Sequence, residues 1–416
     1  MASPQPGIAP GAGPRRPWAG KRVLLGVTGG IAAYKVVQVA RDLTKLGAEV
    51  DVVMTRSARA FVGEVSFEGV TGRPVHTEIL QPGHALDHIR LARAADVVCV
   101  APATADSIAR AAAGRSDDLL GAVLLATRAP VLFCPAMNDL MWSHPATRAN
   151  ADRLRGLGYR LVGPAEGALA YGEGSGPGRM EEPEEIIQHI GRALEGESRY
   201  AARRVVVTAG PTREAVDPVR FLSNRSSGRM GFALAAAVWR RGADVDLIAG
   251  PTVLAPPAGP RVHRVETADE MKRAVQRHIA DADLLIMAAA VADFRPKGAP
   301  ASKIKKEATP EAIPLESAPD ILRETVGDRP SGCLVIGFAL ETEDGVANAR
   351  RKLESKGLDL VVLNQTGPES GFDTETNRVV LLDREGRAEE LPLLSKDEVA
   401  ERILDRVERH MPFPDE

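Results

Sequence analysis

Two stretches of this 416-residue chain each join a continuous apolar strand to a helix through a glycine-rich turn. The first, residues 23–43, reads VLLGVTGGIAAYKVVQVARDL, and the second, residues 205–237, reads VVVTAGPTREAVDPVRFLSNRSSGRMGFALAAA. Backbone N–H groups at the start of such a helix can bind a phosphate. The sequence therefore predicts an anion site in each half, although the glycines of the first turn could equally serve only a tight turn.

Both stretches open a series in which strands alternate with helices. The expected strands are continuous apolar runs, which are typical of a parallel sheet buried on both faces. They are RVLLGV, EVDVVMT, DVVCVAPA and APVLFCPA in the first half, and RVVVTA, DVDLIAG, RVHRV, DLLIMAAAV, CLVIGFAL and LDLVVLN in the second. Helices are expected over residues 31–46, 104–113, 184–194, 230–241, 268–279 and 345–356. The pattern predicts an α/β fold of two doubly wound, Rossmann-like domains, each binding ligands at the carboxyl ends of its strands.

The length of the chain and a polar stretch near its middle predict where the domains lie. A chain of 416 residues exceeds one ordinary core, and EGESRYAARR, residues 195–204, is polar and featureless. The first residues are rich in Pro, Gly and Ala and lack the apolar core of a signal peptide. We expect a disordered tail over residues 1–19, domains over residues 20–194 and 204–416, and a linker over residues 195–203.

The composition excludes several classes of protein. Hydrophobic residues make up 44% of the chain and charged residues 26%, as in ordinary globular proteins. The formal net charge of -3 gives no reason to expect nucleic acid or a membrane as partner, and no apolar run is long enough to span a bilayer. The 3 cysteines are widely spaced, which indicates neither a disulfide framework nor a zinc site and favours a reducing cytoplasm.

The first glycine turn does not fit a nicotinamide site. It lacks the spacing of the dinucleotide fingerprint, and the second strand is followed by Thr55, Arg56 and Ser57 instead of an acidic residue. Hydroxyl groups and a cation suit the phosphate of a mononucleotide better than the diol of a ribose.

Five segments of the first half, in the order GVTGGIAAYK, DHIRLARAAD, APATADSIA, PAMN and GPGRM, resemble the flavin-binding cysteine decarboxylases, in particular the phosphopantothenoylcysteine decarboxylases. The resemblance implies a flavodoxin-like flavoprotein domain that binds FMN. It implies His88 as the active-site histidine and Asn138 as the amide that holds the substrate carboxylate. The implied FMN-binding residues are Gly29, Gly30, Ile31, Thr55, Ser57, Ala101, Pro102, Ala103 and Thr104.

The chemistry of this family explains why a flavin is needed. An alkyl carboxylate loses carbon dioxide only if the electrons left behind have an acceptor, and oxidation of the cysteinyl thiol to a thioaldehyde would create one. Taken alone, His88 could be a capping or core histidine, and Asn138 could satisfy its own backbone in a loop. The five segments together favour the functional roles.

One position departs from the family's pattern. The substrate flap of these decarboxylases carries a cysteine shortly before its GxGRM ending, and this thiol protonates the decarboxylated intermediate. Here the stretch reads LAYGEGSGPGRM, which places Tyr171 at that position, and a phenol is a poorer proton donor at neutral pH than a thiol. We hypothesise that Tyr171, or a water that it orders, is the donor. The alternative is a decarboxylase whose final reduction is impaired, or a partner-binding protein that has lost the activity.

The second turn is far more basic than the first. Arg213, Arg220 and Arg225 surround Asn224 and two serines, a combination that suits several anionic groups at once. NRSSG could instead cap the next helix, but capping and anion binding use the same N–H groups. Downstream, KIKK at residues 303–306 could be a solvated loop, yet behind a strand end it is better interpreted as a mobile clamp for a triphosphate.

Together GPTREAVDPVRFLSNRSSGRMG, AAAVADFRP, KIKK, PDIL and GFALET resemble the phosphopantothenate–cysteine ligases, and the whole chain resembles the fused bacterial coenzyme A biosynthesis proteins. The resemblance implies that CTP activates 4'-phosphopantothenate as an acyl-cytidylate, which the amine of cysteine then attacks. It implies that Asn224 holds this intermediate, that Arg220 contacts substrate, and that Lys303 stabilises charge on the α-phosphate. The implied CTP-binding residues are Met287, Ala288, Ala289, Asp293, Lys303, Pro319, Asp320, Ile321, Leu322, Phe338, Lys352 and Lys356. Mg²⁺ would bridge the phosphates, with its protein ligands left open.

The resemblance also implies an assembly, a homo-dodecamer built from decarboxylase trimers and ligase dimers. Two other enzyme classes share parts of the pattern. A pair of nicotinamide-dependent reductases would need an acidic residue after the second strand of each half, where this chain has Thr55-Arg56 and Ala249-Gly250. A relative of the flavin prenyltransferases would share the first turn but would not carry the second half.

Overall fold

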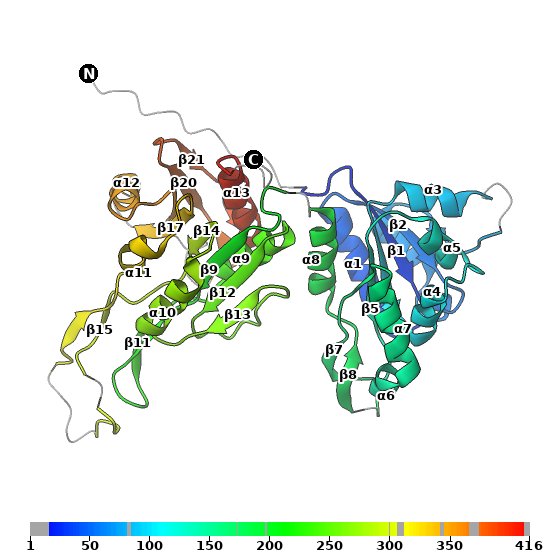
Figure 1. Ribbon diagram of the computed structural model, residues 1–416, viewed down its shortest axis with the longest axis horizontal. Helices are drawn as coiled ribbons and strands as arrows, with labels where there is room; N and C mark the ends of the chain where they lie inside the picture. The colour runs from blue at the N-terminus through cyan, green and yellow to red at the C-terminus, as the bar shows by residue number, and fades with distance from the viewer. Residues whose placement is uncertain are drawn as a thin grey trace. The chain divides into compact units, whose positions relative to one another are not determined.

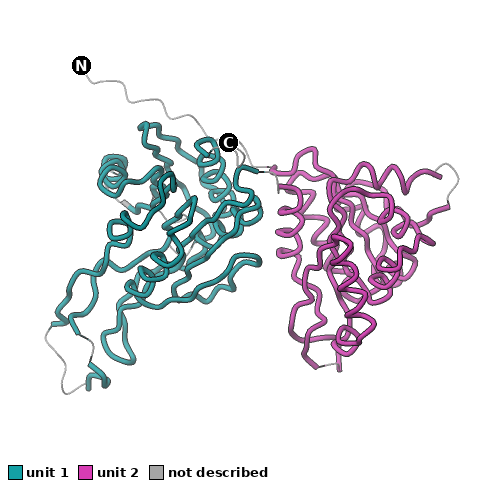
Figure 2. The backbone as a smooth tube through the Cα atoms, in the orientation of Figure 1, with its two compact units in different colours: residues 1–14, 196–416 teal, residues 15–195 magenta. Residues whose placement is uncertain are grey.

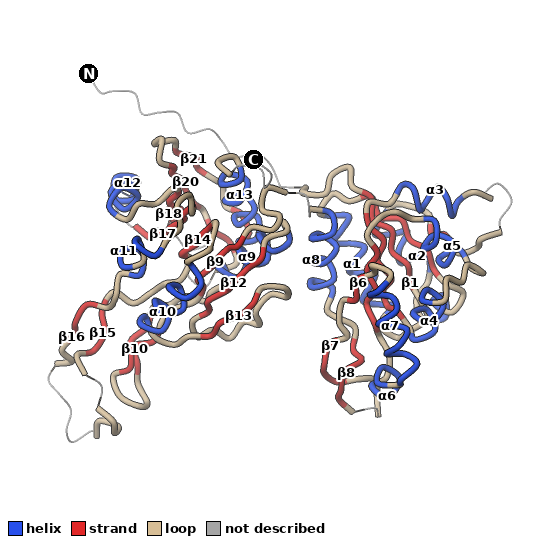
Figure 3. The backbone as a smooth tube through the Cα atoms, in the orientation of Figure 1, coloured by secondary structure: helices blue, strands red, loops and turns tan. Residues whose placement is uncertain are grey.

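The computed structural model (Figure 1) describes residues 16–80, 85–172, 174–195, 198–298, 300–305, 312–341, 345–365 and 374–411. The chain forms two compact units, one of residues 15–195 and one that contains residues 196–416 (Figure 2). In each unit, helices flank a central sheet (Figure 3). The predicted fold class, two doubly wound Rossmann-like domains, is confirmed.

The first unit is built on six parallel strands in the order β3-β2-β1-β4-β5-β6. The strands are β1 (Arg22–Val27), β2 (Glu49–Met54), β3 (Val75–His76), β4 (Val97–Ala103), β5 (Val131–Pro135) and β6 (Arg160–Leu161). This is the Rossmann order, in which β1 lies between β2 and β4. Without the two-residue edge strand β3, the order is that of a flavodoxin, in which the first strand lies between the second and the third, so the expected flavodoxin-like arrangement fits this domain.

Helices cover both faces of the first sheet because its strands bury both faces. The helices are α1 (Ala33–Lys45), α2 (Glu64–Thr71), α3 (Asp87–Ala94), α4 (Ala105–Ala112), α5 (Leu119–Ala126), α6 (Asp139–Ser143), α7 (Pro145–Gly156) and α8 (Pro183–Leu194). Apolar side chains of α1, α2 and α8 pack on one face, and those of α3, α4, α5 and α7 pack on the other. A hairpin of β7 (Ala165–Ala168) and β8 (Ser175–Arg179) stands apart from the sheet.

Two predicted boundaries need correction. The tail was expected to be disordered to residue 19, but Trp18 is 2% exposed in the core of the first unit, and its Nε1 donates to Glu195 Oε1 at 2.6 Å. The linker was expected over residues 195–203, but Tyr200 is buried in the second unit and donates its hydroxyl to Leu404 O at 2.7 Å. One buried aromatic side chain therefore anchors the end of the Pro-rich tail to the first unit, and another anchors the Arg-rich linker segment to the second unit. Residues 1–15 of the tail and residues 196–197 of the linker lie outside the described residues.

The second unit has eight strands in the order β13-β12-β9-β14-β17-β18-β20-β21. Strand β20 runs antiparallel to both of its neighbours, β18 and β21. The strands are β9 (Arg204–Ala209), β12 (Asp244–Ala249), β13 (Arg261–Arg264), β14 (Leu284–Met287), β17 (Leu334–Glu341), β18 (Leu360–Gln365), β20 (Val379–Asp383) and β21 (Ala388–Glu390). The first six repeat the order of the first unit. The antiparallel pair was not predicted.

Helices also cover both faces of the second sheet. They are α9 (Arg229–Arg240), α10 (Ala268–Ile279), α11 (Ile321–Glu324), α12 (Gly345–Ser355) and α13 (Lys396–Glu408). Apolar side chains of α9 and α13 pack on one face, and those of α10, α11 and α12 pack on the other. Three short antiparallel pairs complete the unit: β10 (Arg213–Ala215) with β11 (Phe221–Ser223), β15 (Phe294–Pro296) with β16 (Leu315–Ser317), and β19 (Thr376–Asn377) with β22 (Leu394–Ser395). Within the described residues, no helix combines the length and apolar character needed to cross a membrane.

The burial of Trp18 can be tested by substitution. We expect Trp18→Ala to destabilise the first domain by about 3–5 kcal/mol, because it removes a buried aromatic side chain and leaves a cavity. Trp18→Phe should cost much less, since it keeps most of the apolar contact and loses mainly the hydrogen bond to Glu195. Thermal unfolding of the full-length variants, with hydrogen exchange of the α1 backbone, measures both effects. Unchanged stability in Trp18→Ala would contradict this packing.

Candidate functional site

The first unit has its topological switch point between β1 and β4, where loops from neighbouring strands leave in opposite directions. The hydroxyl of Thr28, directly after β1, donates to Pro102 O at 2.6 Å and accepts from the backbone N–H of Thr104 at 3.3 Å. Thr104 in turn caps α4, accepting from Ser107 N at 3.2 Å. These bonds fix the glycine turn against the start of α4.

Gly29 is required by the close approach of Ser57. A Cβ atom at Gly29 would lie 2.5 Å from both Cβ and Oγ of Ser57, whose hydroxyl also lies 3.3 Å from Thr55 Oγ1. At Gly30 the nearest atoms, on Pro102 and Thr104, would be 3.6 and 3.7 Å from such a Cβ, which is ordinary contact. The glycine turn and the Thr55–Ser57 segment are therefore packed together, as expected if both segments contribute to one phosphate site.

A cavity of about 770 Å³ opens beside these segments, within the usual size of ligand pockets. Thr55, Ser57 and Thr104 line it, whereas the other residues implied for FMN do not. Ala101 and Ala103 are fully buried and do not line the cavity, so their contact with the cofactor stays a prediction. Ile31, in contrast, is 67% exposed and does not line the cavity either. Other lining residues were missed, among them Thr28, Ser107, Arg110, Arg115, Asp117 and Asp118.

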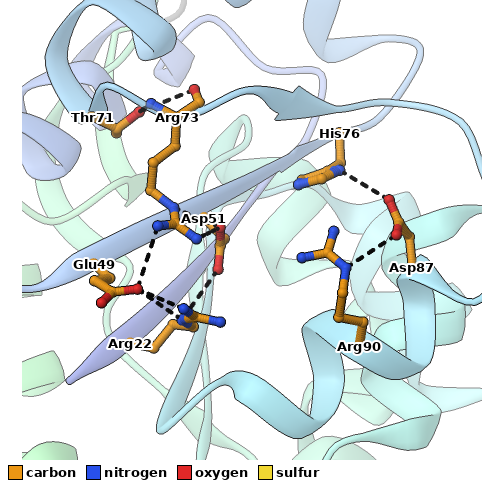
Figure 4. A network of polar contacts seen from close by, with 8 residues as sticks. All are labelled: Arg22, Glu49, Asp51, Thr71, Arg73, His76, Asp87 and Arg90. Carbon is orange, nitrogen blue, oxygen red and sulfur yellow. Dashed lines mark hydrogen bonds and ion pairs between the residues drawn. The ribbon is translucent and has the colours of Figure 1, made fainter. Parts of the chain in front are cut away.

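His88 lies in the first turn of α3 and has an unsatisfied ring nitrogen. Its Nδ1 is buried without a hydrogen-bond partner. The helix is capped at Leu86 without a side-chain bond, so His88 does not cap it. The neighbouring Asp87 holds α3 in place, because its carboxylate lies 3.5 Å from His76 Nδ1 and accepts from Arg90 Nε at 3.1 Å (Figure 4). An unpaired buried nitrogen calls for an explanation, and a ligand contact is one.

Asn138 stands at the start of α6, where the β7–β8 hairpin approaches closely. Its Oδ1 accepts from Leu140 N at 2.9 Å, so the local loop interpretation of Asn138 is correct for that oxygen. Met137 N donates to Gly178 O at 2.9 Å, and a Cβ at Gly178 would lie 2.2 Å from Met137 O. The glycine of the GPGRM segment therefore lets the hairpin lie against the Asn138 loop.

The same hairpin is tied to the glycine-turn helix by charge. Glu182 Oε1 and Oε2 each lie 3.0 Å from Lys35 Nζ on α1, and Glu182 also pairs with Arg179 on β8. The hydrogen bond from Lys35 holds the pKa of the Glu182 carboxyl below its usual value. Tyr171 lies in the loop between β7 and β8, and its side chain is fully exposed.

The second unit has the equivalent switch point between β9 and β14. Two fully buried threonines join the loops there: Thr208 Oγ1 accepts from Ala289 N at 3.2 Å, and Thr212 Oγ1 accepts from Ala292 N at 3.0 Å. Asn224 binds the same loop, because its Nδ2 donates to Ala290 O and to Val291 O, each at 3.1 Å. The basic loop and the segment after β14 thus form one wall.

The start of α9 faces this wall. Its N-cap is Gly228, with a φ of 82° and no side-chain cap, so capping by the NRSSG side chains does not occur at this position. A Cβ at Gly231 would lie 2.9 Å from Thr208 O, which shows how closely the helix approaches the end of β9. Its first backbone N–H groups can therefore face a ligand at the switch point.

A cavity of about 570 Å³ lies at this place. It is lined by most of the residues implied for the nucleotide, namely Asn224, Met287, Ala288, Ala289, Asp293, Pro319, Asp320, Ile321, Leu322, Phe338, Lys352 and Lys356. Lys356 Nζ lies 3.1 Å from Asp320 Oδ2, and Lys352 Nζ donates to Phe338 O at 2.6 Å. Lys352 lies in the last turn of α12 and Lys356 directly follows the helix, and both line the cavity.

Lys303 and Arg220 do not line this cavity. Lys303 is exposed, and the adjacent Ile304 is held by Asp217, whose Oδ2 accepts from Ile304 N at 3.2 Å. Arg220 also engages Asp217, with Nε donating to Oδ2 at 3.0 Å, and it donates to Ile304 O at 3.1 Å. The hydrogen bond from Arg220 keeps the pKa of Asp217 well below its usual value. Arg220 therefore anchors the Lys303 loop, while Lys306 lies outside the described residues.

Among the lining residues that the sequence analysis missed are Asn364, Asn377 and Lys396. Asn364 is the residue before the last in β18, and its Oδ1 is buried without a hydrogen-bond partner. A polar residue at the carboxyl end of a parallel strand was a usable signal. Asn377 and Lys396 come from the unpredicted β19 and α13, which carry no motif.

Comparisons with known proteins cover nearly the whole chain. Residues 14–195 match the family model described as flavoprotein, and residues 200–411 match that of the DNA/pantothenate metabolism flavoprotein C-terminal domain. The coenzyme A biosynthesis bifunctional protein CoaBC of Mycolicibacterium smegmatis is 47% identical over 404 residues, 94% of this chain and 97% of the relative. The protein of the same name from Vibrio cholerae is 42% identical over 398 residues, 94% of this chain and 99% of the relative.

Solved structures resemble the two halves separately. The crystal structure of the C-terminal domain of a CoaBC protein is 39% identical, covers 51% of this chain and 97% of that chain, and has a TM-score of 0.44. A PPC decarboxylase mutant complexed with pantothenoylaminoethenethiol is 32% identical, covers 41% of this chain and 96% of that chain, and has a TM-score of 0.37.

The buried threonine at the second switch point can be tested without reference to activity. We expect Thr208→Val to lower the stability of the second domain by about 1–3 kcal/mol, because it leaves the half-buried N–H of Ala289 without its acceptor. Thr208→Ser is the matched control, since it keeps the hydroxyl and removes one methyl group. Urea unfolding of the full-length variants gives the comparison. Equal stability of Thr208→Val and wild type would show that this hydrogen bond does not hold the loop.

Proposed function

The chain belongs to the family of the bifunctional coenzyme A biosynthesis proteins CoaBC, and we propose from this premise how its residues carry out two consecutive steps. It is an enzyme with a decarboxylase domain and a ligase domain. In the proposed sequence, the C-terminal domain joins 4'-phosphopantothenate to cysteine at the expense of CTP. The N-terminal domain then decarboxylates phosphopantothenoylcysteine to 4'-phosphopantetheine with the help of FMN. The observation that best supports the scheme is the second cavity, which twelve residues implied for the nucleotide and its intermediate line together.

The ligase cavity can hold a triphosphate and a base at once. We propose that Lys352 and Lys356 contact the phosphates and that the segment after β14, with Phe338 and the PDIL turn, holds the cytidine. Mg²⁺, when bound, would neutralise phosphate charge, and Asp293 offers an oxygen ligand of the kind that it prefers. Lys303 stays a prediction, because its exposed side chain does not line the cavity. Its loop would have to move for its Nζ to reach the α-phosphate.

Asn224 is placed to bind the acyl-cytidylate. Its Nδ2 donates to two carbonyls of the β14 loop, and these bonds hold its side chain at the wall of the cavity. The carboxylate of 4'-phosphopantothenate would attack the α-phosphate of CTP and displace diphosphate. The amine of cysteine would then attack the acyl carbon of the acyl-cytidylate and displace CMP. The helix N-terminus at Gly228 would hold an anionic group beside it.

The first cavity fits FMN in size and in chemistry. It offers the hydroxyls of Thr55, Ser57 and Thr104, which suit a phosphate monoester. FMN, when bound, supplies the oxidation and the later reduction that the loss of carbon dioxide from an alkyl carboxylate requires. The unpaired Nδ1 of His88 is available for a substrate or cofactor contact. Because Asn138 uses its Oδ1 locally, its Nδ2 is the end that can donate to the substrate carboxylate.

We also propose an assembly of several copies in the cytoplasm, with decarboxylase trimers and ligase dimers combined into a dodecamer. The exposed apolar side chains of Val219, Phe221 and Phe294 on the hairpins of the second unit support contact between copies. The cysteines are free thiols, as expected in a reducing compartment.

The two activities can be separated at Asn224. We expect Asn224→Ala to slow diphosphate release from CTP, in the presence of 4'-phosphopantothenate and cysteine, by about 100-fold or more, the usual cost of losing one transition-state donor. Release of carbon dioxide from supplied phosphopantothenoylcysteine should stay within twofold of wild type, because the decarboxylase lies in the other domain.

Gln276→Ala is the matched control, an amide on α10 whose Nε2 donates to the exposed Asp328 at 3.0 Å and which lies outside both cavities. It should change neither activity. Wild-type diphosphate release in a folded Asn224→Ala variant would remove Asn224 from the ligase mechanism. Failure of the wild type to consume CTP would overturn the proposed nucleotide.

The proton donor of the decarboxylase can be tested at Tyr171. If the phenol donates, Tyr171→Phe should slow the final reduction by about 100-fold or more, as general acid catalysis predicts, and the decarboxylated enethiol should accumulate. If the phenol is a poor donor, the wild type itself should accumulate that enethiol, and Tyr171→Cys should clear it. Mass spectrometry of the products distinguishes these results. Full wild-type turnover in Tyr171→Phe would rule out the phenol.

A further inference from the structure

Two histidines and one aspartate converge at the edge of the second sheet, away from both cavities. Asp246 comes from β12, His263 from the edge strand β13 and His278 from α10. One ligand atom of each residue, a carboxylate oxygen or a ring nitrogen, lies within 4.8 Å of the other two. Asp246 is buried and the two histidines are half-buried. The packing of β12 against both β13 and α10 fixes this convergence.

The distances suit a shared metal ion. His263 Nε2 lies 2.7 Å from Asp246 Oδ1, and His278 Nδ1 lies 3.8 Å from the same oxygen. Two atoms that each bind zinc at about 2.1 Å are about 3.4 Å apart in a tetrahedral site. The observed separations lie on either side of this value, so small side-chain rotations would bring the three atoms onto one ion.

The two imidazole rings also lie next to each other. Their centroids are only 4.1 Å apart, and a ring nitrogen of each histidine lies beside Asp246 Oδ1. One cation at this place would contact both rings and the carboxylate at once.

Arg261 is the competing cation at this carboxylate. Its Nε lies 3.1 Å from Asp246 Oδ1 and its terminal nitrogen lies 3.0 Å from Oδ2. The same guanidinium also binds Asp244 at 2.7 Å, and half of its side chain is exposed. Arg261 can therefore stay on Oδ2 and Asp244 while Oδ1 accepts a metal, an arrangement in which a hydrogen-bonded carboxylate is oriented by its outer partner.

We propose that Asp246, His263 and His278 form a binding site for a divalent transition metal, with Zn²⁺ as the best match. Two imidazoles and one carboxylate are ligands that Zn²⁺ accepts, with water in the fourth position, whereas Mg²⁺ prefers oxygen atoms alone. The ion would fasten the edge strand β13 to α10. The site contains no cysteine, which is why the cysteine spacing gave no sign of zinc.

The test uses the full-length chain after removal of metals, titrated with ZnCl₂ and separately with MgCl₂ and no nucleotide. We expect one zinc per chain at this site, a higher melting temperature with zinc, and neither effect with magnesium. His263→Gln and His278→Gln keep polar side chains of similar size. Each should weaken zinc binding by about 100-fold or more, because loss of outer partners alone costs 10- to 100-fold. Replacement by Co²⁺ should give visible absorption that both variants lose.

His410→Gln is the matched control, because His410 belongs to the other described group of this kind, with Asp383 and Glu385. It should bind zinc as the wild type does. If both sheet-edge variants bind zinc with wild-type affinity and stoichiometry, the metal lies elsewhere and the proposal fails. It also fails if the wild type takes up no zinc at micromolar concentration, in which case the two imidazoles are only hydrogen-bonding partners of Asp246.

Discussion

In both domains the geometry of the site depends on one kind of contact, a threonine hydroxyl that joins the loops on either side of the switch point. Thr28 binds the backbone of the β4 loop, and Thr208 binds that of the β14 loop. Both lie at the end of the central strand, where the two loops diverge and leave a crevice. Without this bond the crevice would expose unpaired backbone groups. With it, backbone N–H groups and side chains are held for an anion.

The two cavities share this frame but differ in charge. Among the described residues that line the first, three arginines face four carboxylates, Glu78, Asp106, Asp117 and Asp118. Arg110 is already paired with two of these, so little positive charge is left. The second is lined by Arg229, Lys352, Lys356 and Lys396 against two aspartates. The second cavity therefore offers more net positive charge to an anion than the first does.

The sequence predicted the parallel parts of the fold well and the rest poorly. Continuous apolar strands and amphipathic helices have a strong periodic signal, and β9, α10 and most of the others begin and end within a few residues of their expected positions. The antiparallel β20 and β21 and the helix α13 follow the last recognisable motif, so nothing marked them. Composition alone also misplaced the segments that contain Trp18 and Tyr200. Each segment has the composition of a tail or a linker, but a single buried aromatic side chain orders it.

The site residues show why motifs alone do not separate contact from support. Ala101, Ala103 and Arg220 belong to the same motifs as Thr104 and Asn224. The two alanines are nevertheless fully buried and outside the lining of the cavity, and Arg220 is engaged with Asp217. A sequence motif includes every residue that a site needs. Some of these residues only allow two backbone segments to lie close together. Gly178 is of this second kind, because Met137 O occupies the space of its missing Cβ. Only the packing of the loops distinguishes these roles, and that packing depends on residues far apart in the sequence.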